Sequence, residues 1–314
     1  MPVLLGARLY LRDVLAVARG ERVALAPQAA ARIDAARAVV RAKAEAGEVV
    51  YGVTTGFGSL ANVRIERERT VELQHAILRS HATAVGQPLA HDEARAMLVL
   101  RAHVLALGHS GVRREVVERM IELLNLDLIP VVPERGSLGA SGDLAPLAAL
   151  ALPLIGGGSL LVDGRPVEAA VALNRAGLEP LELVEKEGLA LVNGTQGMLA
   201  VGILAGERVR GLCRAADIAA AMSVEAALGT DRAFDARLQS LRPHAGQASS
   251  AANLRRLLDG SAIIASHRSS DHLVQDAYSL RCAPQVHGAT RDVLAFVSSV
   301  LEIEASSVSD NPIV

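Results

Sequence analysis

The 314-residue chain has few aromatic residues, only two cysteines and no tryptophan. Because 51% of the sequence is nevertheless hydrophobic, its core must be built from Leu, Val, Ile and Ala. Two cysteines, Cys213 and Cys282, do not indicate a disulfide framework and favour a reducing, cytoplasmic setting. The formal net charge is only −2, and no basic block is present, so we expect no nucleic-acid partner.

Common metal and phosphate motifs are also missing. The sequence has no Cys-x-x-Cys, no His-Glu-x-x-His and no glycine-rich phosphate loop. His75 and His81 are six residues apart, as are His103 and His109, and this spacing puts the members of each pair on different helix faces. The segment 139–143 is not a serine hydrolase elbow, because its second glycine stands one position early, at 142 instead of 143. We therefore predict no metal site.

One uncharged stretch, residues 144–162, is long enough to resemble a membrane span. Pro146, Pro153 and the glycines at 156–158 interrupt it, so we interpret it as a segment buried inside a large helical protein. The first residues lack the pattern of a signal peptide. We expect no membrane association.

Helical periodicity dominates the chain. We predict helices at residues 27–46, 66–85, 92–107, 113–126, 144–155, 195–228 and 288–307. A small hairpin is expected at 160–167, around Asp163-Gly164. The helix at 195–228 would be roughly 50 Å long and needs partners along its length. The predicted fold is mainly α, a long-helix bundle with a small β accessory, with domains at 1–194 and 195–314.

The chemically most unusual segment is Ala140-Ser141-Gly142, three small residues in a glycine-rich stretch. Glycine allows positive φ and close backbone approach. In a sharp bend the amide nitrogen of Gly142 could approach the carbonyl carbon of Ala140, and loss of the Ser141 hydroxyl would leave an alkene. The segment is therefore either a glycine-rich turn before a helix or an electrophile made from the protein itself.

Scattered polar residues offer further candidates. Asn193 either presents its amide to a substrate or caps the following helix. Gln275, Tyr278 and Arg281 are three apart and share one helix face if that segment is helical; the face is then either solvated or a carboxylate site. His81 is a substrate contact or a structural histidine. The glycine-rich segment 51–59 is expected to be an exposed, mobile loop.

Residues 136–148 resemble the signature of the aromatic amino acid ammonia-lyases, in which an Ala-Ser-Gly triad cyclises to 4-methylideneimidazol-5-one (MIO). Four further blocks agree with that family and follow its order: residues 51–58, 191–196, 242–247 and 275–281. The resemblance covers nearly the whole chain. It implies an ammonia-lyase-like fold, and MIO formed from residues 140–142 without a metal or diffusible cofactor.

The resemblance also implies the site residues. The catalytic set would be Ala140, Ser141, Gly142, Tyr51 and Tyr278, with Tyr51 as the general base. The substrate-binding set would be His81, Asn193, Gln275 and Arg281. In these roles Arg281 binds the carboxylate, Asn193 stabilises charge and His81 contacts an imidazole.

Ser80-His81 resembles the selecting pair of family members that act on histidine, which implies elimination of ammonia from L-histidine to give trans-urocanate. Phenylalanine or tyrosine, as substrates of a lyase or an aminomutase, are alternatives. Family members form homotetramers whose active sites are shared between subunits. They continue well beyond residues 309–312, so a truncated, non-catalytic helical scaffold is a further alternative.

Overall fold

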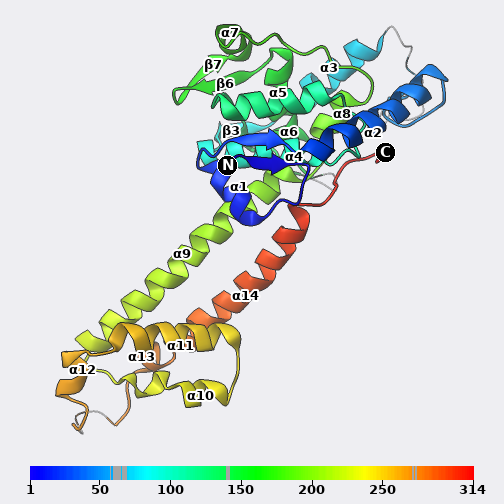
Figure 1. Cartoon of the computed structure of the whole chain (residues 1–314). Coiled ribbons are helices and arrows are strands. Elements are labelled where there is room, and N and C mark those ends of the chain that lie inside the picture. Colours follow the sequence, from blue (N-terminus) through cyan, green and yellow to red (C-terminus); the bar gives the residue numbers. More distant parts are fainter. Residues whose placement is uncertain (57, 59–64, 66–68, 139–141, 271, 273) are drawn as a thin grey trace. The chain divides into compact units, whose positions relative to one another are not determined.

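The computed structural model describes residues 1–56, 58, 65, 69–138, 142–270, 272 and 274–314 (Figure 1). The chain forms two compact units: a first unit of Met1–Leu204 with Leu301–Val314, and a second unit of Ala205–Val300. Helices dominate both units and the strands are short, so the predicted mainly α fold with a small β accessory is confirmed. The domain boundary at residue 194 stays a prediction.

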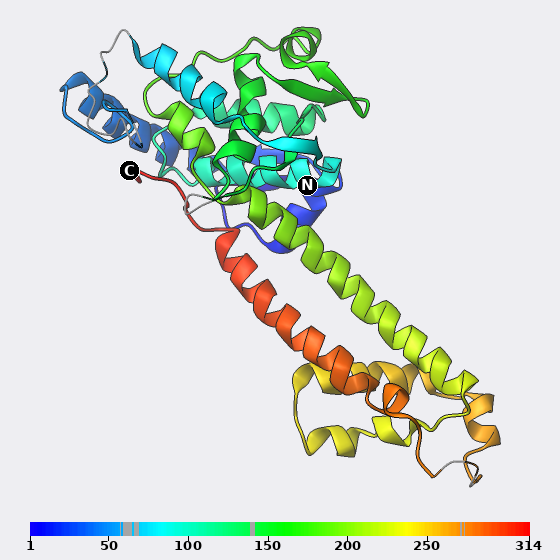
Figure 2. The ribbon, with the colours of Figure 1, turned by 180° about the vertical axis from the view of Figure 1, so that it is seen from behind.

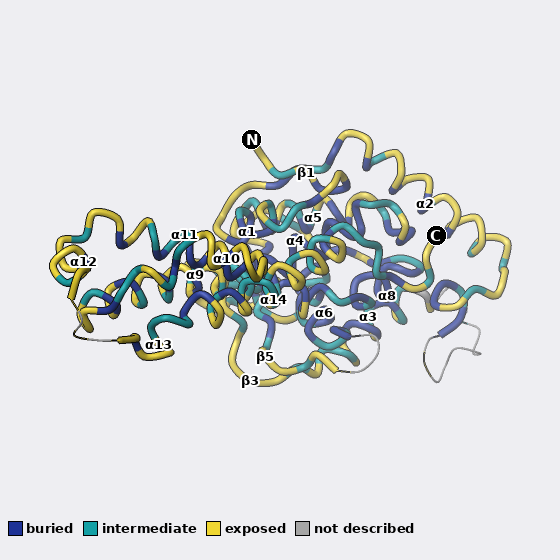
Figure 3. Tube along the Cα trace, turned by 90° about the horizontal axis from the view of Figure 1, so that it is seen from below, coloured by how far each residue is buried: buried dark blue, intermediate teal, exposed yellow. Residues whose placement is uncertain are grey.

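Helix α4 (His91–Ala106) forms the centre of the first unit. Every residue from Ala94 to Ala106 is buried, and helices α1 (Leu11–Ala18) and α5 (Arg114–Asn125) pack against it. Figure 3 shows buried chain gathered around α4 and its neighbours. A helix buried on all sides must find partners for its polar side chains within the protein. In α4 these side chains are Arg95, Arg101 and His103.

The remaining helices of the first unit surround this centre. Helix α2 (Pro27–Glu45) begins at the predicted proline, and much of its length is exposed (Figure 3). Helices α3 (Thr70–His81), α6 (Leu144–Ala151) and α8 (Glu187–Val192) pack on one another. The described residues of this unit also form the short 3-10 helix η3 (Leu152–Ile155) and the short helix α7 (Ala169–Arg175).

In the described part of the chain the strands form three small sheets, all in the first unit. Two are pairs: β1 (Val3–Leu5) runs parallel to β2 (Val23–Leu25), and β3 (Val85–Pro88) runs antiparallel to β5 (Pro133–Arg135). The third has the antiparallel order β4 (Ile129–Pro130), β6 (Ser159–Val162), β7 (Arg165–Glu168). The predicted hairpin is β6–β7, and its turn residues Asp163 and Gly164 both have positive φ.

Two long helices, α9 (Gln196–Ala226) and α14 (Ala283–Glu304), frame the second unit and run side by side there (Figures 1 and 2). Arg210 Nη2 on α9 donates to Ser298 Oγ on α14 at 3.4 Å. The shorter elements are η4 (Asp231–Phe234), α10 (Ala236–Ser240), α11 (Ala245–Leu258), α12 (Ala262–Ser266) and α13 (Tyr278–Arg281). The long helix predicted from 195 is confirmed as α9.

A buried carboxylate joins three helices of the second unit. Asp217 on α9 accepts hydrogen bonds from Ser250 and Asn253 on α11, and it pairs with His287 and Arg291 on α14. Burial alone would raise the pKa of Asp217, but these hydrogen bonds and the charge of Arg291 hold it below the ordinary value. The ionised carboxylate therefore fixes the spacing of the three helices.

The uncharged stretch 144–162 is divided among α6, η3 and β6. Within the part of the chain that the structure describes, no helix is both long enough and apolar enough to cross a bilayer.

His103 makes the first unit sensitive to acid. Its Nδ1 accepts a hydrogen bond from the Gly6 N–H at 3.3 Å, and burial lowers its pKa from 6.5 to about 4. The unfolded chain then binds more protons between these values, so stability falls as the pH drops from about 6.5 to about 4. At 1.36 kcal/mol per pKa unit the loss approaches about 3 kcal/mol.

Urea unfolding of the wild type and of His103→Asn at several pH values tests this. We expect the variant to lose less stability across that pH range, since Asn keeps an acceptor for Gly6 but does not titrate. His244→Asn, at an exposed histidine, serves as the control. Equal pH slopes for the wild type and His103→Asn would contradict the assignment.

Candidate active site

The described part of the triad is Gly142, since Ala140 and Ser141 lie outside the described residues. Gly142 has φ +73°, a conformation that side chains of L-residues rarely adopt. A Cβ added there would lie 3.2 Å from both Met198 Cε and Thr195 Cγ2. The position therefore requires glycine, and it fits the formation of MIO, which needs an unhindered amide nitrogen at the third residue.

The backbone of Gly142 lies beside the turn between α8 and α9. Gly142 forms a parallel bridge with Gly194, and the Asp143 N–H donates to the Gly194 carbonyl at 3.2 Å. The Leu138 N–H donates to the Gly142 carbonyl at 3.0 Å. The structure thus brings Gly142 and the Asn193 turn together, although they are far apart in sequence.

Asn193 follows the last residue of α8, and its N–H donates to the Leu189 carbonyl at 3.0 Å. Its side-chain Nδ2 donates to the Asn311 carbonyl at 2.9 Å. The structure does not support the alternative in which Asn193 caps the long helix, because α9 begins only at Gln196. The Oδ1 atom makes no hydrogen bond with the described part of the chain.

Asp143 is a site residue that the sequence interpretation missed. Its side chain is fully buried, and Oδ2 accepts a hydrogen bond from the Met198 N–H at 2.8 Å, in the first turn of α9. A carboxylate at this end of a helix complements the partial positive charge of the free N–H groups. Asp143, the residue directly after Gly142, is therefore bound to the start of α9 through its side chain.

Replacing Asp143 by asparagine is expected to cost about 1–2 kcal/mol of stability, because the charge at the buried helix end is lost. Urea unfolding followed by circular dichroism measures it. Asp235, which accepts from the Arg237 N–H at the exposed start of α10, provides the matched control. Asp235→Asn should cost less; an equal or larger loss at Asp235 would argue against the capping role of Asp143.

Tyr51 stands at the start of a turn whose following residues are largely buried. The Tyr51 side chain is 37% exposed, and its hydroxyl accepts a hydrogen bond from the Gly58 N–H at 3.4 Å. Gly52 has φ +67°, and an added Cβ there would collide with Leu189 of α8. Residues 52, 53, 55 and 56 are buried, so the prediction of an exposed loop is wrong for them. This packing holds the Tyr51 backbone against α8.

His81 is the last residue of α3. Its Nδ1 lies 2.9 Å from the Ile77 carbonyl and 3.1 Å from Ser80 Oγ. The ring orientation is therefore fixed by its own helix.

The second unit brings Gln275, Tyr278 and Arg281 together on an open pocket of about 390 Å³. Tyr278 and Arg281 lie on the single turn α13, whereas Gln275 precedes it, so the helical condition for one shared face is met at Tyr278 and Arg281 but not at Gln275. The other lining residues are Ala233, Leu238, Gln239, Gln247, Cys282 and Gln285. A guanidinium, a phenol and amides around one opening are suited to a small polar ligand with a carboxylate.

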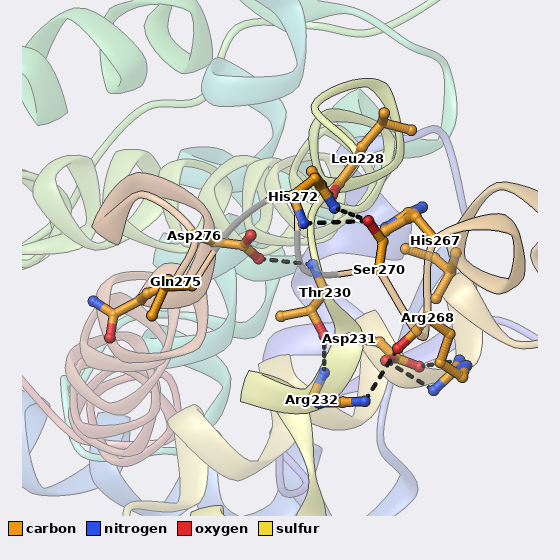
Figure 4. A pocket seen from close by; sticks show the side chains of 12 residues that line it. Leu228, Thr230, Asp231, Arg232, His267, Arg268, Ser270, His272, Gln275 and Asp276 are labelled. Atoms are coloured by element: carbon orange, nitrogen blue, oxygen red, sulfur yellow. Dashed lines mark hydrogen bonds and ion pairs between the residues drawn. The ribbon is translucent and has the colours of Figure 1, made fainter.

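Asp276 holds this segment in place. Its buried carboxylate accepts a hydrogen bond from the Thr230 N–H at 2.7 Å (Figure 4). Figure 4 also shows Gln275 pointing away from Thr230 and His272, which line a smaller neighbouring pocket of about 160 Å³. Gln275 lines both pockets, whereas Asp276 lines only the smaller one.

Among the described residues, no cluster of three or more His, Cys, Asp or Glu side chains is arranged to hold a metal ion.

The family profile described as aromatic amino acid lyase matches residues 9–314. The chain belongs to the aromatic amino acid lyase family. The resemblance drawn from the five sequence blocks is therefore confirmed. The roles assigned to individual site residues stay predictions.

Individual members of the aromatic amino acid lyase family agree with this assignment. The histidine ammonia-lyase of Sorangium cellulosum is 53% identical over 316 residues, which is 99% of this chain and 61% of that relative. Two solved structures are each 39% identical and cover 100% of the chain. They are histidine ammonia-lyase from Trypanosoma cruzi, with TM-score 0.88 and 58% of that protein covered, and tyrosine aminomutase from Streptomyces globisporus, with TM-score 0.91 and 63% covered. The chain thus spans about 61% of the length of the curated relatives it matches.

Proposed function

We propose that this chain carries the MIO-bearing part of a histidine ammonia-lyase, a carbon–nitrogen lyase that converts L-histidine to trans-urocanate and ammonia. The observation that carries the proposal is the 53% identity to a histidine ammonia-lyase over 99% of the chain. The left-handed, closely packed Gly142 supports formation of MIO from residues 140–142.

MIO formed from these residues would supply an electrophilic alkene that captures the substrate amine and turns it into a better leaving group. The chain's own side chains bind and orient the substrate and move its proton. Arg281 holds the carboxylate with its guanidinium fork. Tyr51 removes the β-proton. His81 contacts the imidazole, Tyr278 and Gln275 complete the polar wall, and Asn193 stabilises developing charge.

We further propose a cytoplasmic homotetramer whose active sites draw residues from more than one copy. The two free cysteines, Cys213 and Cys282, support a reducing compartment. Large apolar side chains on α14 of the second unit support self-association. They recur at heptad spacing and are exposed in the single chain: Val286, Val293, Phe296 and Val300.

The intact mass of the purified chain tests this proposal first, because cyclisation removes two waters. The chain is then incubated with L-histidine, L-phenylalanine and L-tyrosine, and the products are identified. Urocanate as the main product supports the proposal. An encoded mass without loss, on a folded chain, would reject MIO and leave the non-catalytic helical scaffold.

A second candidate is chemistry on tyrosine. The similarity to the Streptomyces globisporus tyrosine aminomutase favours it. In the same incubations a β-amino acid formed from tyrosine, without urocanate from histidine, would select this alternative.

A further inference from the structure

Two cations are completely buried in the first unit, and they share one acidic neighbour. Arg101 of α4 and Lys186, which precedes α8, both have no exposed surface. Lys186 Nζ lies 2.7 Å from Asp310 Oδ2. Burial lowers the pKa of Arg101 to about 10 and also lowers that of Lys186, while Asp310 opposes both effects. Burying charges is unfavourable unless they are well paired. The hydrogen bonds and ion pairs of Arg101 and Lys186 must therefore compensate for the loss of water around these two cations.

The Arg101 guanidinium binds both sides of the turn between α8 and α9. Nη1 donates to the Asn193 carbonyl at 3.0 Å and to Gln196 Oε1 at 2.8 Å. Nη2 donates to the carbonyl of Ala190. The last carbonyls of a helix have no partner within the helix, and a cation there also complements the helix dipole. Arg101 therefore ends α8 and clamps it to the first residue of α9.

The segment 309–311 closes the same turn by separate contacts. Gln196 Nε2 donates to Ser309 Oγ at 2.7 Å, and Asn193 Nδ2 donates to the Asn311 carbonyl at 2.9 Å. Asp310, between these two residues, is held by Lys186. The backbone of Asn193 is thus bound through Arg101, while its side-chain amide is bound through Asn311.

Gly194 shows how closely the turn fits around the guanidinium. An added Cβ would lie 2.5 Å from Arg101 Nη1 and would also collide with Gln196 Oε1. The Gly194 carbonyl accepts from Asp143 N–H, beside Gly142. A displacement of Arg101 would therefore reach both the Asn193 amide and the backbone next to the triad.

We propose that Arg101 is a positioning residue: it fixes the turn that carries Asn193, while Lys186 and Asp310 hold the segment that binds the Asn193 side chain. Arg101 is fully buried and acts only through these neighbours. The inference rests on the proposed function for the role of Asn193, but the geometry of the turn stands apart from turnover. Lysine cannot replace arginine here, because one ammonium cannot reproduce a planar fork with acceptors on two helices.

The test compares Arg101→Lys with Arg95→Lys in the 314-residue chain. Arg95 is the matched control: it lies on the same helix, is also buried, and donates to the carbonyls of Val17 and Leu124, away from the turn. Hydrogen–deuterium exchange by mass spectrometry follows peptides covering 187–199 and 305–314. Turnover of L-histidine gives kcat and KM, and intact mass reports the two-water loss.

For Arg101→Lys we expect exchange in those two peptides to rise on the order of tenfold, with the rest of the first unit less affected. Where the unmodified chain turns over histidine, kcat should fall on the order of 10²-fold, as a displaced active-site group predicts. Arg95→Lys should leave both peptides and kcat per folded molecule unchanged. Ser309→Ala removes only the acceptor for Gln196 and should raise exchange in the same two peptides to a smaller extent. This variant replaces Arg101→Lys as the test if Arg101→Lys does not fold.

Exchange in the two peptides that stays at the wild-type level, or that rises equally with Arg95→Lys, would overturn the positioning role. If the unmodified chain is active, a kcat of Arg101→Lys equal to that of Arg95→Lys would also overturn the positioning role. If the unmodified chain shows neither mass loss nor turnover, the proposed function fails, and the exchange pattern alone still decides whether Arg101 orders the turn.

Discussion

Replacing Ser141 by alanine is expected to leave the chain at its encoded mass and to abolish ammonia release. In the proposed cyclisation the Gly142 nitrogen would join the Ala140 carbonyl carbon, and that carbonyl oxygen would be released as water. The Ser141 hydroxyl would leave with the α-hydrogen as the second water. Alanine has no hydroxyl to lose, so the alkene cannot form. Removing a covalent catalyst from another enzyme costs on the order of 10⁶ in kcat, so turnover should fall below detection.

Ser137→Ala is the matched control for this experiment. Ser137 is an exposed serine of the same stretch, four residues before Ser141. Its replacement should leave both the two-water loss and the turnover unchanged. Mass loss that persists in Ser141→Ala, or that disappears in Ser137→Ala, would move the electrophile away from residues 140–142.

Replacing Asp310 by asparagine is expected to destabilise the first unit by about 3–5 kcal/mol, which is typical when one member of a buried ion pair is removed. Asparagine keeps the shape, and its side-chain oxygen can still accept from the Asn311 N–H, as Asp310 Oδ1 does at 2.7 Å. Lys186 and Arg101, however, would remain buried without the carboxylate that opposes their desolvation. Urea unfolding, followed by circular dichroism because the chain has no tryptophan, measures the loss.

Two companion variants make the result specific. Asp310→Asn combined with Lys186→Met removes both charges and should recover much of the stability, since an apolar replacement of a buried pair is often neutral. Asp127→Asn breaks the pair with Arg95, but the Asp127 side chain is 64% exposed, so the loss should stay below about 1 kcal/mol. A loss at Asp310 no larger than that at Asp127 would show that the buried charges need no counter-ion.

Elements with strong local signals could be predicted from sequence. Helix α2 begins at Pro27, and the β6–β7 hairpin turns at Asp163-Gly164. Helix α9 was predicted because its periodic pattern has no break before Gly229. The sequence encodes the start of a helix more weakly than its periodic interior. Helix α14 begins at Ala283 rather than Gly288, because Pro284 can occupy a first helical turn.

Other predictions failed where distant contacts override the local pattern. The helix predicted at 66–85 continues too far: the observed helix α3 ends at His81. Val85 lies instead in strand β3, where it pairs with Arg135. The glycine-rich loop after Tyr51 was expected to be exposed, but Gly52 packs on Leu189 of α8. The glycine content of a segment indicates how freely its backbone can bend. Whether the segment is buried depends on which other element packs against it.

The same distinction applies to the site. Gly142 and Asn193 were predicted because they fall in family blocks that are contiguous in sequence. Asp143 directly follows the triad, yet its capping of α9 depends on a contact with Met198, 55 residues later. Arg101 interrupts an apolar helical run, which was the one available signal for it. Nothing local distinguishes Lys186 from a surface lysine.

The separation of Lys186 and Asp310, 124 residues along the chain, also constrains the order of events during synthesis. Domains tend to fold from the N-terminal end as the ribosome extends them. In this protein the N-terminal unit cannot bury Lys186 with its partner until residue 310 has emerged, after the whole of Ala205–Val300 has been translated. Completion of this charge cluster must therefore wait while the 124 residues from Lys186 to Asp310 are translated.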